Sequence, residues 1–149
     1  CAIADGEVYC WGSNWSGQLG DGTNDDSNVP VAVSTDGVLA GKTVTSISAG
    51  QSQTCAIADG KAYCWGENWN GELGNGTNDH SSVPMAVVAD GALADKTVTA
   101  ISSSPGGWHT CAIADGAVYC WGAGESGELG NGSNITYDVP VAVSPLPLI

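Results

Sequence analysis

The chain has 149 residues, a length that suits one domain with its own core. Its net charge is −13, and lysine is its only basic residue type apart from two histidines. Nucleic acid and anionic lipid are therefore not expected as partners, because both require clustered Lys and Arg. No apolar run approaches the length of a membrane span, so membrane insertion is not expected either.

Three near-identical segments organise the chain. They read CAIADGEVYCWG, CAIADGKAYCWG and CAIADGAVYCWG, and they start 54 and 56 residues apart at Cys1, Cys55 and Cys111. The two extra residues lie in the segment SPGGWHT over 104–110, where the preceding repeat has the shorter GQSQT. Such self-similarity is typical of folds built from repeated units. The whole chain, 1–149, is thus one segment with repeats over 1–54, 55–110 and 111–144 and a Pro-containing tail over 145–149.

Each repeat predicts four short β-strands, which makes the expected fold all-β. In the first repeat CAIA and EVYC flank Asp5-Gly6, a dipeptide typical of two-residue hairpin turns. The β-prone segment KTVTSIS over 42–48 precedes the next such hairpin. The last strand of each repeat is expected at a sheet edge, because proline cannot donate to the ladder; the prolines are Pro30, Pro84 and Pro140.

The six cysteines are expected to form three disulfides, one in each hairpin. With Asp5-Gly6 as the turn, Cys1 lies opposite Cys10 in a non-hydrogen-bonded pair, whose Cα atoms are about 4.5 Å apart. That distance suits a disulfide, whereas the spacing matches no zinc pattern. The same register pairs Cys55 with Cys64 and Cys111 with Cys120. Disulfides persist in oxidising compartments, so the chain is expected to be secreted, extracellular or at a cell surface, with the periplasm as an alternative.

Both faces of the predicted hairpin are apolar. The alternation of side chains puts Cys1, Ile3, Val8 and Cys10 on one face, and Ala2, Ala4, Tyr9 and Trp11 on the other. A sheet with two apolar faces has to be covered on both sides. Four-stranded sheets stacked face to face around an axis meet this requirement, and this arrangement is the β-propeller.

The block YCWG-x-N-x-x-GQLGDGT, a Pro-containing strand, and then V-x-x-I-x-x-G and HTCAI resemble the regulator of chromosome condensation repeat. The resemblance covers the chain except for its last five residues. It implies a seven-bladed propeller with four antiparallel strands per blade, so about three blades are expected here, the first without its leading strand. The cysteine-bracketed form resembles repeats of secreted bacterial proteins. Chromatin binding and nucleotide exchange are not carried over, because the acidic, Arg-free composition departs from the nuclear pattern.

Two loop tryptophans are the candidate partner contacts. Trp15 and Trp69 follow the CWG strand in the first two repeats, and Glu125 occupies this place in the third. Loop aromatic residues that differ between repeats are typical of contact residues. The alternative is that these tryptophans wedge between neighbouring blades.

Two further loop features carry candidate sites. Asp21, Thr23 and Asp25 place alternating oxygen side chains in a Gly-containing loop, which is a candidate Ca²⁺ site; an ordinary polar loop is the alternative, since the sister loops lose charge. No metal or other cofactor is otherwise expected. Four asparagines begin N-x-S/T sequons and are candidate glycosylation sites: Asn14, Asn75, Asn131 and Asn134.

No nucleophile with a base, paired acids or phosphate loop stands out, so the chain is not expected to be an enzyme. The sequence favours an extracellular or cell-surface scaffold for binding or adhesion, whose ring-face loops contact a protein or a surface glycan. The alternative is a structural repeat unit that assembles with other propeller blades, or with copies of itself, into a surface array or fibre.

Overall fold

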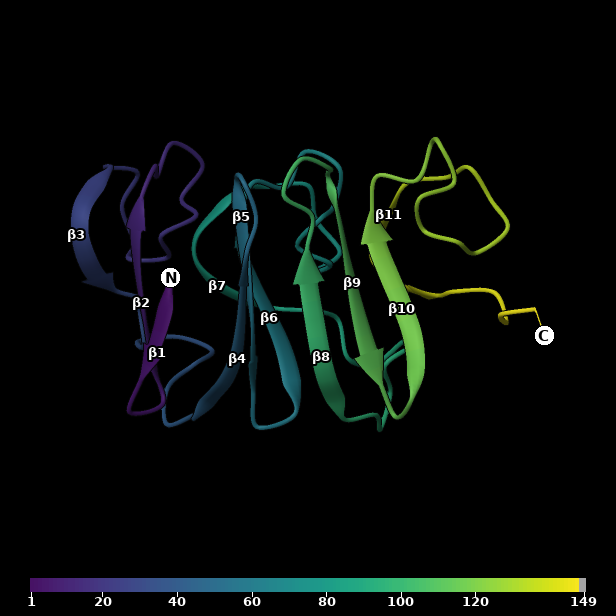
Figure 1. The fold of residues 1–149 in the computed structure, drawn as a ribbon, viewed down its shortest axis with the longest axis horizontal. Helices are drawn as coiled ribbons and strands as arrows, with labels where there is room; N and C mark the ends of the chain where they lie inside the picture. Colours follow the sequence, from purple (N-terminus) through teal and green to yellow (C-terminus); the bar gives the residue numbers. More distant parts are fainter. Residues whose placement is uncertain (148–149) are drawn as a thin grey trace.

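The computed structural model describes residues 1–147 and contains three separate antiparallel sheets that stand side by side (Figure 1). The first sheet has three strands in the order β1 (Ala2–Ala4), β2 (Glu7–Gly12) and β3 (Ser27–Ala32). The second has four, in the order β4 (Val44–Ala49), β5 (Gln53–Ala58), β6 (Lys61–Gly66) and β7 (Ser81–Ala86). The third has four, in the order β8 (Val98–Ser103), β9 (His109–Ala114), β10 (Ala117–Gly122) and β11 (Tyr137–Ala142).

These sheets are propeller blades, as the sequence predicts, and the first lacks a leading strand. β4 is the first strand of the second blade, and β8 is the first strand of the third. Each of these blades therefore begins before the cysteine at which the sequence repeat begins. The observed β4 starts two residues after the predicted segment 42–48 and ends one residue after it. Within residues 1–147 no helix is long and apolar enough to cross a membrane.

The Pro-containing strands β3, β7 and β11 each lie at a sheet edge, which confirms the prediction from Pro30, Pro84 and Pro140. The opposite edge of the second and third blades is formed by β4 and β8, which lie against each other across the blade boundary. There Ser103 donates its backbone N–H to Ser48 Oγ over 2.9 Å. The leading strands therefore lie on the side where neighbouring blades come closest.

The hairpin register is the predicted one. Asp5 and Gly6 have φ of 53° and 78°, the left-handed values that a two-residue type I′ turn needs at both positions. β1 and β2 then pair Ala4 with Glu7, and the corresponding pairs recur in the other blades. The three predicted disulfides are confirmed, with Cα–Cα distances of 4.0, 4.1 and 4.1 Å: Cys1–Cys10, Cys55–Cys64 and Cys111–Cys120.

The core lies between blades. The Cys/Ile/Val face of one blade packs against the Ala/Tyr/Trp face of the next, and this contact occurs twice. Val8 and Cys10 pack with Ala56 and Trp65 at the first interface. The second interface brings together the equivalent side chains Cys55, Ile57, Cys64, Ala112, Ala114, Tyr119 and Trp121. Each hairpin face thus has one type of neighbour, which gives the row of blades a direction.

A pair of hydrogen bonds fixes the register of each interface. Trp65 Nε1 and Thr54 Oγ1 both donate to the backbone carbonyl of Gln18, over 2.9 and 2.8 Å. Trp121 Nε1 and Thr110 Oγ1 repeat this arrangement at the carbonyl of Glu72, each over 2.9 Å. Both tryptophans are fully buried, so these bonds form away from water. Trp65 and Trp121 therefore each anchor their blade to the loop of the preceding blade.

The two end faces of the row are uncovered. Ala2 and Ala4 are exposed on the first blade, and Trp11 has 46% of its surface exposed. On the third blade Ile113 and Val118 are 41% and 38% exposed, on the opposite type of face. The residues equivalent to all of these in the central blade are buried. The two exposed faces are therefore the two halves of one blade interface.

The isolated 149-residue chain is expected to self-associate, because exposed apolar faces and open sheet edges drive association. Sedimentation velocity should show species heavier than one chain, and Ile113→Asp should reduce them by putting a charge on one end face. Ile135→Asp, the same chemical change at an exposed position in the loop over 123–136, is the matched control and should leave association unchanged. A monodisperse monomer would contradict the expectation.

Candidate interaction site on the loop face

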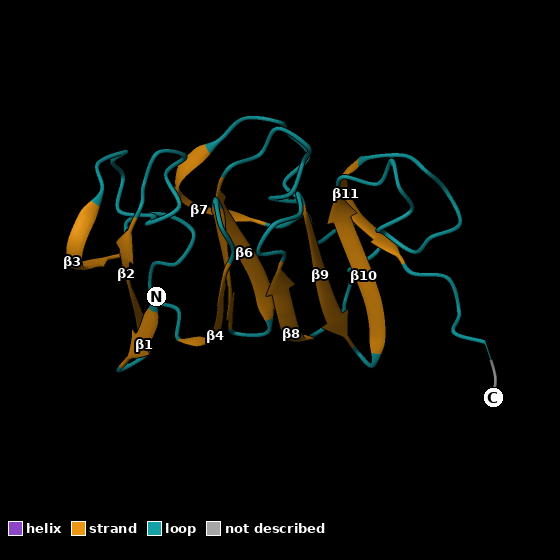
Figure 2. Cartoon of the chain, turned by 45° about the horizontal axis from the view of Figure 1, so that its top comes forward, coloured by secondary structure: helices purple, strands orange, loops and turns teal. Residues whose placement is uncertain are grey.

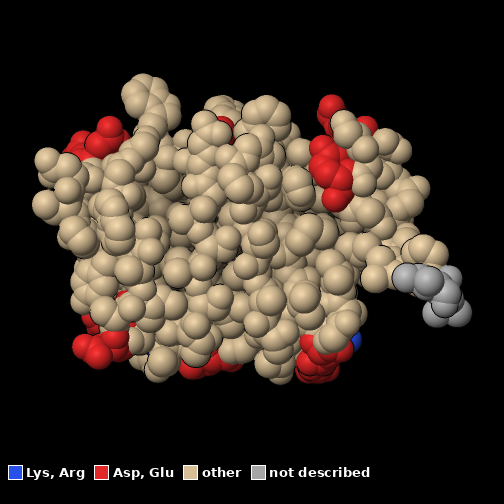
Figure 3. All heavy atoms as spheres, in the orientation of Figure 1, with Lys and Arg blue, Asp and Glu red and all other residues tan. Residues whose placement is uncertain are grey.

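Long loops over 13–26, 67–80 and 123–136 follow β2, β6 and β10 and gather at one end of the blades, with the β4–β5 and β8–β9 connections (Figures 1 and 2). We call this end the loop face. The two-residue hairpin turns lie at the opposite end. Acidic side chains gather at both ends, and most of the surface between them is free of charge in the view of Figure 3.

A buried asparagine organises each of the first two loops. Asn14 is fully buried, and its Nδ2 donates to Asp21 Oδ1, to the carbonyl and Oγ1 of Thr23, and to the carbonyl of Asp25, over 3.0–3.4 Å. Its Oδ1 accepts the backbone N–H of Leu19 over 2.9 Å. An amide suits this place because it offers both donors and an acceptor. Asn14 thus ties the loop together from inside.

Asn68 does the same in the second blade. Its Nδ2 donates to Asn75 Oδ1, to both oxygens of Thr77 and to the carbonyl of Asp79, over 2.9–3.3 Å. Leu73 N–H donates to its Oδ1 over 2.9 Å. In the third blade Gly124 holds this position, and a Cβ there would collide with the carbonyl of Ile135. The third loop is therefore packed differently from the other two.

These contacts correct two interpretations from the sequence. Asn14 is not an available glycosylation site in this fold, because its Nδ2 is buried and fully engaged. The side-chain oxygens of Asp21 and Thr23, two of the candidate Ca²⁺ ligands, accept from this amide nitrogen instead. Asp25 contributes its backbone carbonyl, so the loop is an ordinary polar loop closed by Asn14. Among residues 1–147 no cluster of three or more His, Cys, Asp or Glu side chains could hold a metal ion. The sequons at Asn75, Asn131 and Asn134 stay predictions.

Replacing Asn68 by aspartate is expected to cost at least about 2–3 kcal/mol of stability. The oxygen that takes the place of Nδ2 would face the four acceptors to which the amide now donates. Asn78→Asp makes the same chemical change at an exposed position of the same loop and should cost no more than about 0.5 kcal/mol. Urea unfolding followed by circular dichroism measures both. Equal costs for the two variants would show that the buried amide does not organise the loop.

The candidate contact residues occupy equivalent places on the loop face. Trp15 and Trp69 are 88% and 70% exposed, and Glu125 is also exposed. An asparagine Nδ2 from the same loop donates to the backbone carbonyl of each one, over 3.2, 3.2 and 3.0 Å respectively. The alternative that these tryptophans wedge between blades is therefore wrong. Their role as partner contacts stays a prediction.

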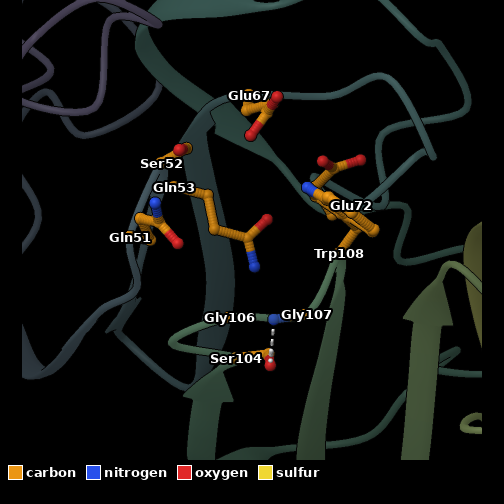
Figure 4. A pocket seen from close by; sticks show the side chains of 9 residues that line it. All are labelled: Gln51, Ser52, Gln53, Glu67, Glu72, Ser104, Gly106, Gly107 and Trp108. Atoms are coloured by element: carbon orange, nitrogen blue, oxygen red, sulfur yellow. Dashed lines mark hydrogen bonds between the residues drawn. The ribbon is translucent and has the colours of Figure 1, made fainter.

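The structure adds a pocket that the sequence analysis does not identify. It lies between the second and third blades on the loop face, has a volume of about 240 Å³, and is lined by Gln51, Ser52, Gln53, Glu67, Glu72, Ser104, Gly106, Gly107 and Trp108. Gln53 and Glu67 point toward its middle, and Glu72 and Trp108 lie across from Gln51 and Ser52 (Figure 4). Trp108 is 56% exposed, whereas Gln53 and Glu72 are buried.

Two buried acceptors in this pocket have no partner. Glu72 Oε2 accepts the N–H of Asn70 over 2.7 Å, but Glu72 Oε1 accepts no hydrogen bond. Gln53 Nε2 donates to Thr110 Oγ1 over 2.8 Å, which leaves Gln53 Oε1 unpartnered. Burial raises the pKa of Glu72, because the charged carboxylate loses its hydration there. The pocket is thus a place where a hydrogen-bond donor is missing.

The first blade interface has a different side chain at the place of Glu72. Gln18 stands at the place of Glu72, and it is satisfied there: its Oε1 accepts Ser16 N–H over 3.0 Å, and its Nε2 donates to the carbonyl of Gln51 over 3.4 Å. The two extra residues of the segment 104–110 also make the β8–β9 connection longer than the β4–β5 connection. The sequence shows this difference only as a longer connection and as Gln18 in the place of Glu72.

Comparison with known proteins agrees with the fold. The family model of the regulator of chromosome condensation (RCC1) repeat matches residues 5–57, 59–113 and 115–148. The ultraviolet-B receptor UVR8 of Arabidopsis thaliana is 36% identical over 140 residues, which are 93% of this chain and 30% of the receptor. The human E3 ubiquitin-protein ligase HERC2 is 33% identical over 148 residues, which are 98% of this chain and 3% of the ligase. The chain therefore spans less than a third of these relatives.

Two solved structures show the same arrangement of blades. Human WBSCR16 superposes with a TM-score of 0.81 and 28% identity, covering 96% of this chain and 35% of that protein. Prp20p of Saccharomyces cerevisiae superposes with a TM-score of 0.73 and 23% identity, covering 95% of this chain and 35% of that one. Prp20p is described by its binding to Gsp1p and histones. At this identity the likeness to Prp20p concerns the fold alone.

Proposed function

Because the chain belongs to the regulator of chromosome condensation (RCC1) repeat family, we propose that it is a non-catalytic β-propeller scaffold that binds a protein partner through its loop face, outside the cytosol. Propellers of this family are typically scaffolds for protein–protein interaction. The proposal adds to that general role a binding face, a class of contact residues and a compartment.

The observation that carries the proposal is the pair of exposed tryptophans on braced loops. Trp15 and Trp69 occupy the same position on adjacent blades, and buried Asn14 and Asn68 hold their loops from inside. An exposed indole offers a large contact area, and a rigid support lowers the entropy that is lost on binding. Two such side chains on one face suit a partner that spans both blades.

The proposed compartment follows from the three disulfides and from charge. All six cysteines are paired, and such bonds persist where the surroundings are oxidising. The acidic, Arg-free composition disfavours nucleic acid as a partner and suits a basic protein surface. We therefore place the chain in a secreted or cell-surface protein, with adhesion as one use of the same loop face.

Binding of the disulfide-intact protein to arrays of secreted proteins and of surface glycans tests the proposal. We expect saturable binding to at least one protein, lost in the Trp15→Ser/Trp69→Ser variant. Val29→Ser/Val83→Ser is the matched control, because it removes exposed apolar side chains from the edge strands β3 and β7 of the same two blades. Binding to glycans alone would replace the protein partner by a glycan, and no saturable binding by the folded protein would overturn the proposal.

Self-assembly into an array or fibre is the second candidate function. The direction of the blade interfaces favours it, because the Cys/Ile/Val face of one blade fits the Ala/Tyr/Trp face of another. A heterologous contact of this kind closes into a ring or continues as a filament, depending on the rotation between copies. Electron microscopy of the sedimenting species distinguishes the two outcomes.

A further inference from the structure

We propose that the pocket between the second and third blades is a lysine-binding pocket, which takes the ammonium group of a lysine side chain from a partner protein between Glu72, Glu67 and Gln53. The inference rests on the proposed function in one respect, since the lysine belongs to a bound protein. The inference goes beyond the proposed function by naming the recognised group, an ammonium, and the residues that bind that group.

The hydrogen-bonding pattern calls for a donor to Glu72 Oε1 and Gln53 Oε1. The other polar atom of each buried side chain is already committed, because Asn70 N–H occupies Glu72 Oε2 and Thr110 Oγ1 accepts from Gln53 Nε2. One acceptor on each side chain, Glu72 Oε1 and Gln53 Oε1, therefore remains free. A buried acceptor without a partner costs free energy. An ammonium group supplies three donors and no acceptor.

The charges around the pocket favour a cation as its ligand. Glu67 and Glu72 both line the pocket, and none of the lysines does. Lys61 and Lys96 line a different pocket. Lys42 lines another one, beside the turn residue Gly6. A cation that enters from outside would thus be the first positive charge beside Glu72. Since burial raises the pKa of Glu72, the cation would favour release of the carboxyl proton.

The shape of the site favours lysine over arginine. A guanidinium group binds a carboxylate best through two parallel hydrogen bonds, but Glu72 has a single free oxygen because Asn70 holds the other. An ammonium group is a compact point charge and needs only one oxygen from each acceptor. The half-exposed indole of Trp108 lies at the pocket, where it can cover the aliphatic stem of a lysine and attract its charge.

The repeats provide an internal comparison. The same framework holds Gln18 at the first interface, where both polar atoms of the side chain are satisfied within the chain. Only the second interface combines a carboxylate at this place with the longer connection that carries Trp108. A glutamine at position 72 is therefore compatible with the fold and lacks only the charge.

An NMR titration with N-acetyl-lysine methylamide tests the pocket without any partner protein. We expect saturable shifts of the Trp108 indole and Gln53 amide signals. N-acetyl-norleucine methylamide, which lacks the ammonium group, should give no such shifts. Glu72→Gln should weaken binding at least about tenfold, which corresponds to about 1.4 kcal/mol. Glu128→Gln, the same change at the equivalent position of the third blade, should leave binding unchanged, because Glu128 is exposed and lines no part of this pocket.

The pH dependence gives a second readout. Protonation of Glu72 removes the charge that holds the ammonium group, so affinity should fall as the pH is lowered through the raised pKa of Glu72. In the Glu72→Gln variant the affinity for the lysine probe should no longer depend on pH in this way. A thermal melt of the same sample shows whether the variant is folded.

Three results would overturn the inference: equal binding of the norleucine probe, unchanged affinity in folded Glu72→Gln, or no saturable shifts with the lysine probe. If Ca²⁺ alone caused the shifts, the pocket would be a metal site. None of them bears on Trp15 and Trp69. The pocket and the proposed scaffold function therefore fail separately.

Discussion

Replacing both Cys55 and Cys64 by alanine is expected to lower the free energy of unfolding by about 4–5 kcal/mol. Loss of a cross-link that closes a loop of about ten residues accounts for about 2–3 kcal/mol of this. The remainder comes from the space left in the second blade interface, where both cysteines are fully buried. Urea unfolding of the oxidised protein, followed by circular dichroism, measures the loss.

Cys111→Ala/Cys120→Ala is the matched control. It removes a cross-link of the same length, but Cys111 is only half-buried at an uncovered end face, so the cost should be about 2–3 kcal/mol. Burial also predicts the order of reduction under limiting dithiothreitol. Alkylation and peptide mapping should find Cys55–Cys64 reduced last, because its sulfurs are the least accessible of the three pairs. Reduction of that pair first would contradict the proposed packing.

Gly74→Ala is expected to cost about 2–5 kcal/mol, from two sources. Gly74 has φ of +67°, a left-handed conformation that costs other residues about 1–2 kcal/mol. A Cβ at this position would also lie 2.6 Å from Nε1 of Trp121, the nitrogen that donates to the Glu72 carbonyl. The indole would have to move, and crowding of a packed core costs about 1–3 kcal/mol. A thermal melt should show a lower transition temperature.

Gly130→Ala separates these two sources. Gly130 holds the equivalent position in the third blade, with φ of +63°, but no tryptophan of a following blade lies against it in residues 1–147. Its Cβ would meet Val143 Cγ1 at 3.1 Å, a contact that a small shift relieves. We expect a cost of about 1–2 kcal/mol, from the backbone conformation. If Gly74→Ala cost no more than this, the tryptophan anchor would contribute little to the interface.

The features that sequence predicts well here are local. Asp5-Gly6 defines a turn, the turn defines the register, and the register brings Cys1 opposite Cys10. Side-chain alternation then predicts two apolar faces, and the central blade confirms that both are covered. Pro30 predicts an edge strand by its missing N–H. Each of these steps needs only neighbouring residues or one hairpin.

The features that sequence does not predict depend on contacts between distant segments. Asn14 reads as a surface sequon, yet it is buried because a loop folds back over it and closes around its amide. The lysine-binding pocket requires Gln53 and Glu72 of one blade to meet Trp108 of the next. No turn rule or periodicity relates positions that lie in different blades. The exposure of Trp15 likewise depends on how its loop packs, which its place in the sequence leaves open.

The direction of the blade interfaces has a consequence for evolution. At both interfaces a Cys/Ile-bearing face of one blade meets the Ala/Tyr/Trp face of the next, with closely similar side chains. A duplicated blade inserted at any boundary therefore meets a compatible neighbour on both sides, without any compensating mutation. Gene segments of this kind can be gained or lost by unequal recombination while the packing is kept. Sequence divergence is then free to concentrate on the loop face, where blades that share one interior acquire different surfaces.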